Sequence, residues 1–147
     1  MILKLERDGS KREPEVLIKY SSMDEEVERL VALIQSADTR VKCRYDGKEK
    51  YVNVSDIYYI ESVDKKTFIY GEKEVYQTDF RLHELEEKFG NIGFVRISKS
   101  CILNIRMLDV IRPLVNSRLE ATLINGERVF VTRKYLSDIK SALQAGG

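Results

Sequence analysis

The sequence has little of the material from which most enzyme active sites are built. It contains one histidine, His83, and two cysteines, Cys43 and Cys101, which stand far apart without metal-ligand spacing. Both cysteines lie in apolar segments, where a free cysteine usually packs as a small hydrophobic residue. The eight glycines are scattered over turns and form no phosphate-binding loop. We therefore expect no enzyme, no catalytic residue, no metal site, no cofactor and no small-molecule substrate, and we place His83 at a surface or an edge.

Long apolar runs and a surplus of charge of one sign are also missing. The apolar stretches are too short to span a bilayer, and residues 1–7 (MILKLER) are charged too early for a signal peptide. The two cysteines are therefore expected to be reduced thiols in a cytoplasmic protein. The chain has 147 residues, 43% of them hydrophobic and 33% charged, which allows one globular domain with a short appended unit.

Charge is balanced in total but not along the chain. The 25 Lys and Arg against 24 Asp and Glu give a net charge of +1, which by itself argues against a nucleic-acid partner. Residues 1–38, however, hold six basic and nine acidic residues, whereas residues 39–147 carry a net charge of +4. Residues 96–147 alone hold nine basic and four acidic residues. This asymmetry indicates an anionic partner, unless it is ordinary variation in a charged surface.

Residues 1–38 predict a small unit of their own. A turn signal at 8–10 (DGS) separates two strand-like segments, 2–5 and 15–20, which favours a hairpin with a charged loop. Ser21 and Ser22 precede an acidic first turn and are expected to cap a helix that ends near Ser36. One face of this helix is apolar, made of Val27, Leu30, Val31 and Ile34. That face packs either on the domain itself or on a partner.

Residues 39–147 predict about eight short strands and two short helices. Turn signals separate the strands, the strongest being Asn125-Gly126. The helices are expected over 80–89 and 133–143, each with leucines at helical spacing. Because the predicted strands outnumber the helices and do not alternate regularly with them, the pattern indicates a β-dominated α+β domain.

Positive charge stands where three of these segments end. Side chains at segment ends project outward, and Lys and Arg donate to phosphate oxygens, while Arg can also bind guanine through two hydrogen bonds. Unless these are merely solvated surface charges, they are candidates for binding an anion. The candidate residues are Lys65, Lys66, Arg96, Ser98, Lys99, Arg133, Lys134 and Tyr135.

The part of the chain from about Val41 to Leu143 resembles the LytTR family of bacterial DNA-binding domains. No single motif carries the resemblance, but four segments follow one another in the family's order. They are residues 54–62 (VSDIYYIES), 82–89 (LHELEEKF), 94–104 (FVRISKSCILN) and 129–135 (VFVTRKY).

The resemblance implies an elongated, twisted antiparallel sheet whose loops, rather than a recognition helix, enter successive major grooves of DNA. It places Lys65 and Lys66, Lys99 and Arg133 at the positions that contact DNA. Some 38 residues precede the resembling part, too few for the receiver domain of the best-known members. The chain thus looks like a stand-alone member, divided into an extension, 1–38, for dimerisation or partner docking and a DNA-binding domain, 39–147. Some such proteins are paired with a small membrane protein that restrains them.

Three functions follow from these observations. The first is a sequence-specific transcriptional regulator that binds paired repeats in double-stranded DNA as a homodimer. The second is a non-catalytic protein-interaction domain with an incidental basic patch. The third, an enzyme, has the least support because no acid, base or nucleophile pair is spaced for catalysis. Asn104 is expected to be structural, closing a backbone turn after a short apolar stretch.

Overall fold

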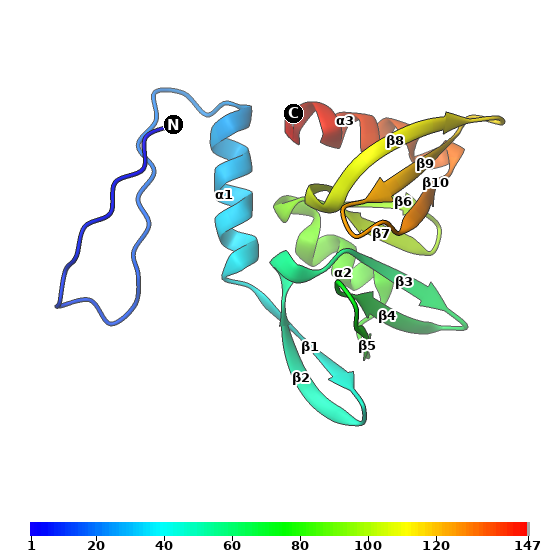
Figure 1. Cartoon of the computed structure of the whole chain (residues 1–147), viewed down its shortest axis with the longest axis horizontal. Helices are drawn as coiled ribbons and strands as arrows, with labels where there is room; N and C mark the ends of the chain where they lie inside the picture. Colours follow the sequence, from blue (N-terminus) through cyan, green and yellow to red (C-terminus); the bar gives the residue numbers. More distant parts are fainter. Residues whose placement is uncertain (147) are drawn as a thin grey trace.

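The computed structural model describes residues 1–146, which form ten strands, three α-helices and four short 3₁₀ turns (Figure 1). In chain order these are α1 (Glu25–Ala37), β1 (Arg40–Tyr45), β2 (Lys48–Asn53), η1 (Val54–Asp56), β3 (Tyr59–Val63), β4 (Lys66–Tyr70), β5 (Val75–Thr78), α2 (Leu82–Phe89), η2 (Gly90–Ile92), β6 (Phe94–Ser98), β7 (Cys101–Asn104), η3 (Ile105–Met107), β8 (Leu108–Leu114), β9 (Arg118–Leu123), β10 (Arg128–Val131), η4 (Arg133–Tyr135) and α3 (Leu136–Gly146). The predicted β-dominated α+β class is confirmed.

The strands form two antiparallel sheets rather than one. Seven strands pair in the order β2-β1-β5-β4-β3-β7-β6, and three pair in the order β10-β9-β8. The number of strands exceeds the predicted eight or so. Strand β8 also continues through Pro113, which is paired with Leu119. Proline has no N–H to donate, but it is tolerated here because β8 is the edge strand of its sheet.

Two apolar clusters hold the fold together. In the first, α2 covers the seven-stranded sheet with Leu82, Leu85 and Phe89, as the spacing of these residues predicts. In the second, Ile139 of α3 packs with residues of β6, β7, β9 and β10 and is fully buried. His83 lies exposed on α2, as expected. The second cluster thereby joins the small sheet and α3 to the end of the large sheet.

The predicted N-terminal hairpin is wrong, although its turn is present. The Asp8 carboxylate accepts hydrogen bonds from the backbone N–H and the hydroxyl of Ser10, and Lys11 N donates to Asp8 O. The segments on either side form no strand, and most of their length stands away from the domain (Figure 1). The terminal amine of Met1 lies 3.9 Å from a carboxylate oxygen of Glu26 in α1. Ile2, Leu5 and Leu17 are exposed, so the segments bury no apolar face. A two-stranded hairpin without such a face has too little to stabilise it.

The predicted helix over the twenties and thirties is confirmed as α1, but its cap is Asp24 rather than Ser21 or Ser22. The Asp24 carboxylate accepts a hydrogen bond from Val27 N at 3.0 Å, which satisfies one of the free N–H groups of the first turn. Val27 is buried, and α1 packs against η1, η2 and α3, whereas Leu33 and Ile34 remain exposed. The apolar face of α1 is therefore divided between the domain and the solvent.

None of the helices in residues 1–146 has the length and apolar character needed to cross a membrane.

Both cysteines are buried free thiols, which leads to a first prediction. Burial raises the pKa of the Cys101 thiol to about 12, with a further contribution from the charge of Glu61 against an opposing one from Arg96, and burial also raises the pKa of Cys43. The thiolate is the reactive form, so the folded protein should react very slowly with a thiol reagent at pH 8. After unfolding in guanidinium chloride, both thiols should react at once. Rapid reaction of either thiol in the native protein would contradict this burial.

Candidate nucleic-acid interface

Three predicted binding segments meet at one end of the two sheets. These are the β3–β4 turn, the β6–β7 turn and η4, which lie side by side at the edge opposite the N-terminal segment (Figure 1). Ser62 N at the end of β3 donates to Ser100 O in the β6–β7 turn at 2.8 Å. Thr132 N, just before η4, donates to Ile97 O of β6 at 2.9 Å. Backbone hydrogen bonds thus fix the spacing of all three segments.

Arg96 and a β-bulge shape the β6–β7 turn. The register of β6 against β7 shifts between Arg96 and Ser98, and such a bulge bends a strand and re-aims its side chains. The Arg96 side chain then folds under the turn, where Nε donates to Ser98 O at 2.8 Å and Nη2 donates to Lys99 O. Its Nη1 lies 3.4 Å from a carboxylate oxygen of Glu86 in α2. Arg96 therefore supports the turn from below, while Lys99 is exposed at its tip.

Ser98 also has a role within this turn. Its hydroxyl oxygen accepts a hydrogen bond from Ser100 N at 3.3 Å, which closes the turn around Lys99. Direct contacts of Arg96 and Ser98 with DNA remain predictions. Their hydrogen bonds go to the β6–β7 turn and to Glu86 of α2, so both residues help to present Lys99.

The β3–β4 turn holds its residues in an unusual backbone conformation. Asp64 and Lys65 have φ angles of +51° and +65°, a left-handed region that side chains disfavour and glycine adopts freely. Two successive residues of this kind make the type of tight turn that matches the twist of a hairpin. Lys65 and the following Lys66 are exposed. Asp46, Asn116 and Ser117 adopt the same left-handed conformation in other turns, so the role of the Lys65 side chain in binding stays a prediction.

The third segment, η4, precedes α3. The predicted helix over 133–143 thus begins as a 3₁₀ turn, with Tyr135 N donating to Thr132 O at 3.0 Å. Arg133 and Lys134 are exposed. Tyr135 is half-buried and packs against the second apolar cluster, with Lys134 Nζ 5.6 Å from the centre of its ring. Tyr135 anchors this segment, and its contact with DNA remains a prediction.

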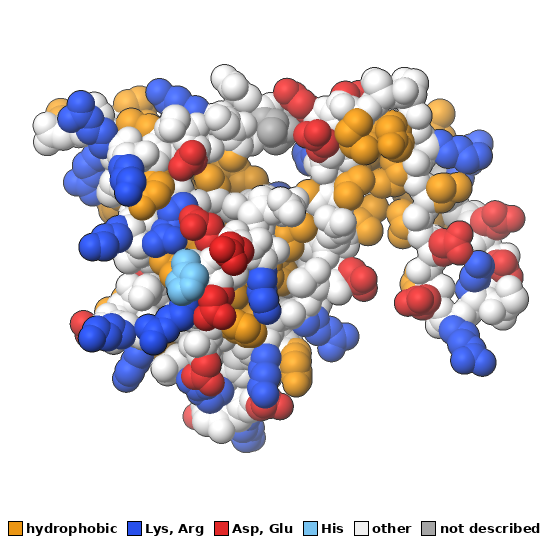
Figure 2. Space-filling model, turned by 180° about the vertical axis from the view of Figure 1, so that it is seen from behind, with side chains coloured by type: hydrophobic (Ala, Val, Ile, Leu, Met, Phe, Trp, Pro, Cys, Tyr) orange, Lys and Arg blue, Asp and Glu red, His pale blue; other side chains and the backbone are white. Residues whose placement is uncertain are grey.

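The cations of this edge have no carboxylate partners. Among residues 1–146, ion pairs involve other basic groups, including Arg96, but none of Lys65, Lys66, Lys99, Arg133 and Lys134. Figure 2 shows Lys and Arg side chains gathered along the edge opposite the N-terminal segment. The unpaired charge is available to an anion without first breaking an internal ion pair. We call these five residues the basic edge.

Arg118 was missed by the reasoning from sequence. It is exposed at the first position of β9, after the Asn116–Ser117 turn. Leu119 pairs with Val131, so Arg118 lies at the end of the small sheet where Arg133 follows β10. Its guanidinium stands 5.5 Å from the centre of the Phe130 ring. The same sequence pattern that identified the other candidates, a basic residue next to a turn, is also present at Arg118.

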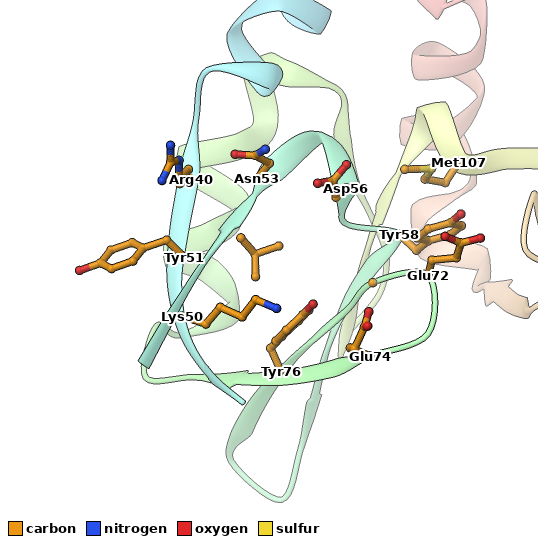
Figure 3. A pocket seen from close by; sticks show the side chains of 12 residues that line it. Arg40, Lys50, Tyr51, Asn53, Asp56, Tyr58, Glu72, Glu74, Tyr76 and Met107 are labelled. Carbon is orange, nitrogen blue, oxygen red and sulfur yellow. The ribbon is translucent and has the colours of Figure 1, made fainter. Parts of the chain in front are cut away.

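A hollow on another face of the molecule has a different chemical character. It has a volume of about 490 Å³, and its lining includes the carboxylates of Asp56, Glu72 and Glu74 (Figure 3). Lys50 is held there by aromatic rings, with Nζ 5.4 Å from the centre of the Tyr76 ring and 5.6 Å from that of Tyr45. The three carboxylates would repel phosphate. In the part of the chain that the structure describes, no three His, Cys, Asp or Glu side chains are grouped to hold a metal.

Replacing Lys65 by glycine should separate stability from binding. The left-handed conformation at this position is unfavourable for a side chain by about 1 kcal/mol, so K65G should raise the free energy of unfolding by about that amount. The same change removes a cation of the basic edge and should lower affinity for DNA. Urea unfolding and duplex binding, measured on the same protein, test both effects.

Lys73 offers a matched control for K65G. It is an exposed lysine in the β4–β5 loop, and its φ is not positive. K73G removes the same charge but relieves no backbone strain. There glycine only raises the conformational entropy of the unfolded chain, so the protein should become slightly less stable. Its DNA affinity should stay unchanged. Destabilisation by K65G comparable to that by K73G would show that Lys65 is not strained.

Comparison with known proteins agrees with the resemblance. The family model described as the LytTr DNA-binding domain matches residues 47–144. The sensory transduction protein LytT of Bacillus cereus is 34% identical over 93 residues, which cover 63% of this chain and 38% of that protein. LytT of Enterococcus faecalis is 31% identical over 88 residues, covering 60% and 36% of the two chains. The chain thus spans little more than a third of the length of these relatives.

Two further proteins are similar over larger shares of their own length. An uncharacterized HTH-type transcriptional regulator of Staphylococcus aureus is 26% identical over 145 residues, 97% of this chain and 98% of that one. The solved LytTr DNA-binding domain from Bacillus cereus superimposes with a TM-score of 0.68 at 28% identity, covering 71% of this chain and 96% of that domain. Since the family model spans well over half of the chain, the protein belongs to the LytTr family of DNA-binding domains.

Proposed function

We propose that this protein is a transcriptional regulator that binds double-stranded DNA in a sequence-specific way. The observation that carries the proposal is the basic edge, five cations on three segments of fixed spacing that form no ion pair within residues 1–146. Segments that project from the end of a sheet can enter the major groove, where each base pair presents a distinct pattern of donors and acceptors. The similar regulator of Staphylococcus aureus supports the regulatory part of the proposal.

Within the basic edge we assign different tasks to different residues. Lys99 is assigned to a base because it is exposed at the tip of the β6–β7 turn. Arg133 is assigned to a base because it is exposed at the start of η4 and Arg can bind guanine through two hydrogen bonds. Lys65, Lys66 and Lys134 are assigned to phosphates, which fix the position of the protein on the duplex. Arg118, at the same end of the small sheet, would extend the row of cations.

Salt titration of duplex binding tests this function. Each phosphate contact contributes a slope of roughly −0.9 to a plot of log affinity against log salt. The three lysines assigned to phosphates would give a slope of about −2.7, and a slope near −4.5 would mean that Lys99 and Arg133 contact phosphates as well. A first selection of bound duplexes from a random pool would supply the specific site, which we expect to contain paired repeats. Absence of any salt-sensitive duplex binding would rule out the function.

The alternative is a protein-interaction domain. It would use the unpaired edges β2, β6, β8 and β10 or the exposed apolar residues of α1, with the basic edge as ordinary surface. Such a domain would bind its partner with little dependence on salt if the contact is apolar. The same titration therefore distinguishes the two functions.

We further propose that residues 1–38 bring two copies together, so that two domains bind paired repeats. The exposed Leu33 and Ile34 of α1 and the exposed apolar residues of the N-terminal segment supply an uncovered apolar surface, which can be buried by a second copy. The protein would act in the cytoplasm, where its DNA is found. A restraining membrane protein, as the resemblance implies for some such regulators, would be a further partner of this extension.

Truncation tests the dimerisation role. A chain that starts at residue 24 retains α1 and its cap but lacks the exposed segment, so it separates the two parts of the extension. We expect the full chain to sediment as a dimer and the truncated chain to shift toward monomer, with its unfolding temperature nearly unchanged because residues 1–23 bury almost nothing. An unchanged mass after removal of residues 1–38 would contradict the role of the extension.

A further inference from the structure

Strand β8 presents an open edge of the small sheet. It is the longest strand within residues 1–146, and it lies at the edge of its sheet. Residues 109–113 of β8 are all exposed, and two of them, Val110 and Ile111, are large apolar residues. Successive side chains of a strand point to opposite faces, so β8 is open to solvent on both faces. A long edge strand of this kind can pair with an additional strand.

The other free edges are less suited to such pairing. The strands β6 and β10 face each other, since Thr132 N, just after β10, donates to Ile97 O of β6. Strand β2 carries three successive charged residues, Lys48, Glu49 and Lys50, and charged side chains protect an edge from pairing. The edge of β8 is therefore the one most open to another strand.

The N-terminal segment contains a stretch that lacks a pairing partner. Residues 15–20 (EVLIKY) are rich in residues that favour strands, and Val16, Leu17 and Tyr20 among them are exposed. Their backbone groups form no hydrogen bond with other backbone groups of residues 1–146. The segment lies on the side of α1 away from β8, so β8 of the same copy stays open (Figure 1). A segment and an edge that are separated within one copy can meet between two copies.

In one antiparallel register the two sequences match at four successive positions. The opposed residues are Pro14 and Pro113, Glu15 and Arg112, Val16 and Ile111, and Leu17 and Val110. Since proline has no N–H to donate, the two prolines end the new ladder at the same place. Ile111 pairs with the buried Ala121 of β9, so Val16 extends the inner face of the sheet, and Leu17 extends the outer face. Beyond Val110 the bulge of β8 ends the regular register.

The same register also matches the charges. Arg112 lies 3.1 Å from a carboxylate oxygen of Glu120, yet 64% of its side chain is exposed, so it can accept a second carboxylate. Glu15 pairs with Lys11 within its own segment, but both side chains are exposed, and an exposed ion pair of this kind contributes little. Glu15 can therefore exchange Lys11 for Arg112 at small cost. Opposite charges across a strand pair favour the register that brings them together.

We propose that residues 15–20 of a second copy add to β8 as a fourth strand of the small sheet, and that two copies exchange these segments. This rests on the dimerisation that we propose for residues 1–38, and it names the surface to which that extension binds. Backbone hydrogen bonds supply the affinity, and the matched side chains fix the register. The exchange closes after two copies, because each copy provides one segment and one edge.

Cross-linking of introduced cysteines tests the register in the full chain. In the double variant V16C/I111C the two opposed Cβ atoms would lie about 5 Å apart, within reach of a short bismaleimide. The native Cys43 and Cys101 are buried and should not react. We expect a covalent dimer on a denaturing gel, whereas V16C/V75C, with its second cysteine at an exposed valine of β5, should remain a monomer on that gel. A link within one chain, or no link, would overturn the inference.

A charge on the open edge tests the same contact without cysteines. Ile111 is exposed in a single copy, so I111K should leave stability unchanged, but the new charge would be covered by the added strand. Self-association measured by sedimentation should weaken at least about tenfold. V75K, the same change at a similarly exposed residue, should stay dimeric. An unaltered dimer in I111K would overturn the inference.

Two measurements on the unchanged protein keep the proposals apart. A dimer in sedimentation, combined with no link in V16C/I111C, would defeat only the pairing of residues 15–20 with β8. Absence of salt-sensitive duplex binding would defeat the proposed function, whatever the cross-linking shows.

Discussion

Replacing Arg133 by alanine should weaken binding to the specific duplex by about 1–3 kcal/mol, or roughly five- to 150-fold, if the guanidinium binds a base. Arg133 is exposed at the start of η4, and Thr132 beside it is fixed by its hydrogen bond to Ile97 O. Within the described residues the Arg133 side chain forms no ion pair, so its loss should not alter stability. Affinity for the specific duplex and for a random duplex, each measured at two salt concentrations, checks the prediction.

The comparison of duplexes decides which contact Arg133 makes. A loss on the specific duplex alone indicates a base, whereas an equal loss on both duplexes, with a smaller salt slope, indicates a phosphate. K140A is the matched control, since Lys140 is an exposed cation on α3 outside the basic edge. It should change neither affinity by more than about twofold, through long-range charge alone. Unchanged binding by R133A on both duplexes would remove Arg133 from the interface.

Replacing Asn104 by leucine should have the largest effect on stability. Asn104 is fully buried, its Nδ2 donates to Ile57 O at 2.8 Å, and its Oδ1 accepts a hydrogen bond from Arg106 N at 3.2 Å. Leucine has a similar size but leaves both backbone groups without partners. Each lost partner of a buried group lowers stability by about 1–3 kcal/mol, so N104L should reduce the free energy of unfolding by about 3 kcal/mol or more.

Urea unfolding and thermal melting measure this loss. For a chain of this length, about 3 kcal/mol corresponds to a decrease in Tm of about 6–12 °C. N53L is the control, because Asn53 is exposed before η1 and makes no capping hydrogen bond with its side chain. It should change stability by less than about 0.5 kcal/mol. A loss below about 1 kcal/mol in N104L would mean that a rearrangement satisfies the groups around position 104.

The sequence was informative where pattern and packing agree. The helix with Leu82, Leu85 and Phe89 on one side was predicted correctly, because its apolar face meets a sheet that also follows a regular pattern. The three segments of the basic edge were predicted because turns and strand ends have local signals. The structural role of Asn104 is confirmed by its two side-chain hydrogen bonds.

The features that could not be predicted from the sequence depend on contacts between segments that are distant in the chain. Arg96 was predicted to bind DNA, which stays a prediction, but its hydrogen bonds to the β6–β7 turn were not predicted because they depend on a bulge in β6. The N-terminal hairpin failed because alternation of apolar residues is insufficient without a surface to cover them. The hollow lined by Asp56, Glu72 and Glu74 could not be predicted either, because its lining comes from segments that lie between Arg40 and Met107 in the sequence.

The hydrogen bonds Ser62 to Ser100 and Thr132 to Ile97 have a mechanical consequence. They join backbone to backbone, so the distances between the three segments of the basic edge are set within the protein and not by the duplex. If these segments bind DNA as proposed, a duplex that does not match their intervals must bend or change its groove width, and the energy of that deformation depends on base pairs that the protein does not touch. Changes in flexible steps between the base pairs that the three segments contact should therefore alter affinity even where every contacted base is kept.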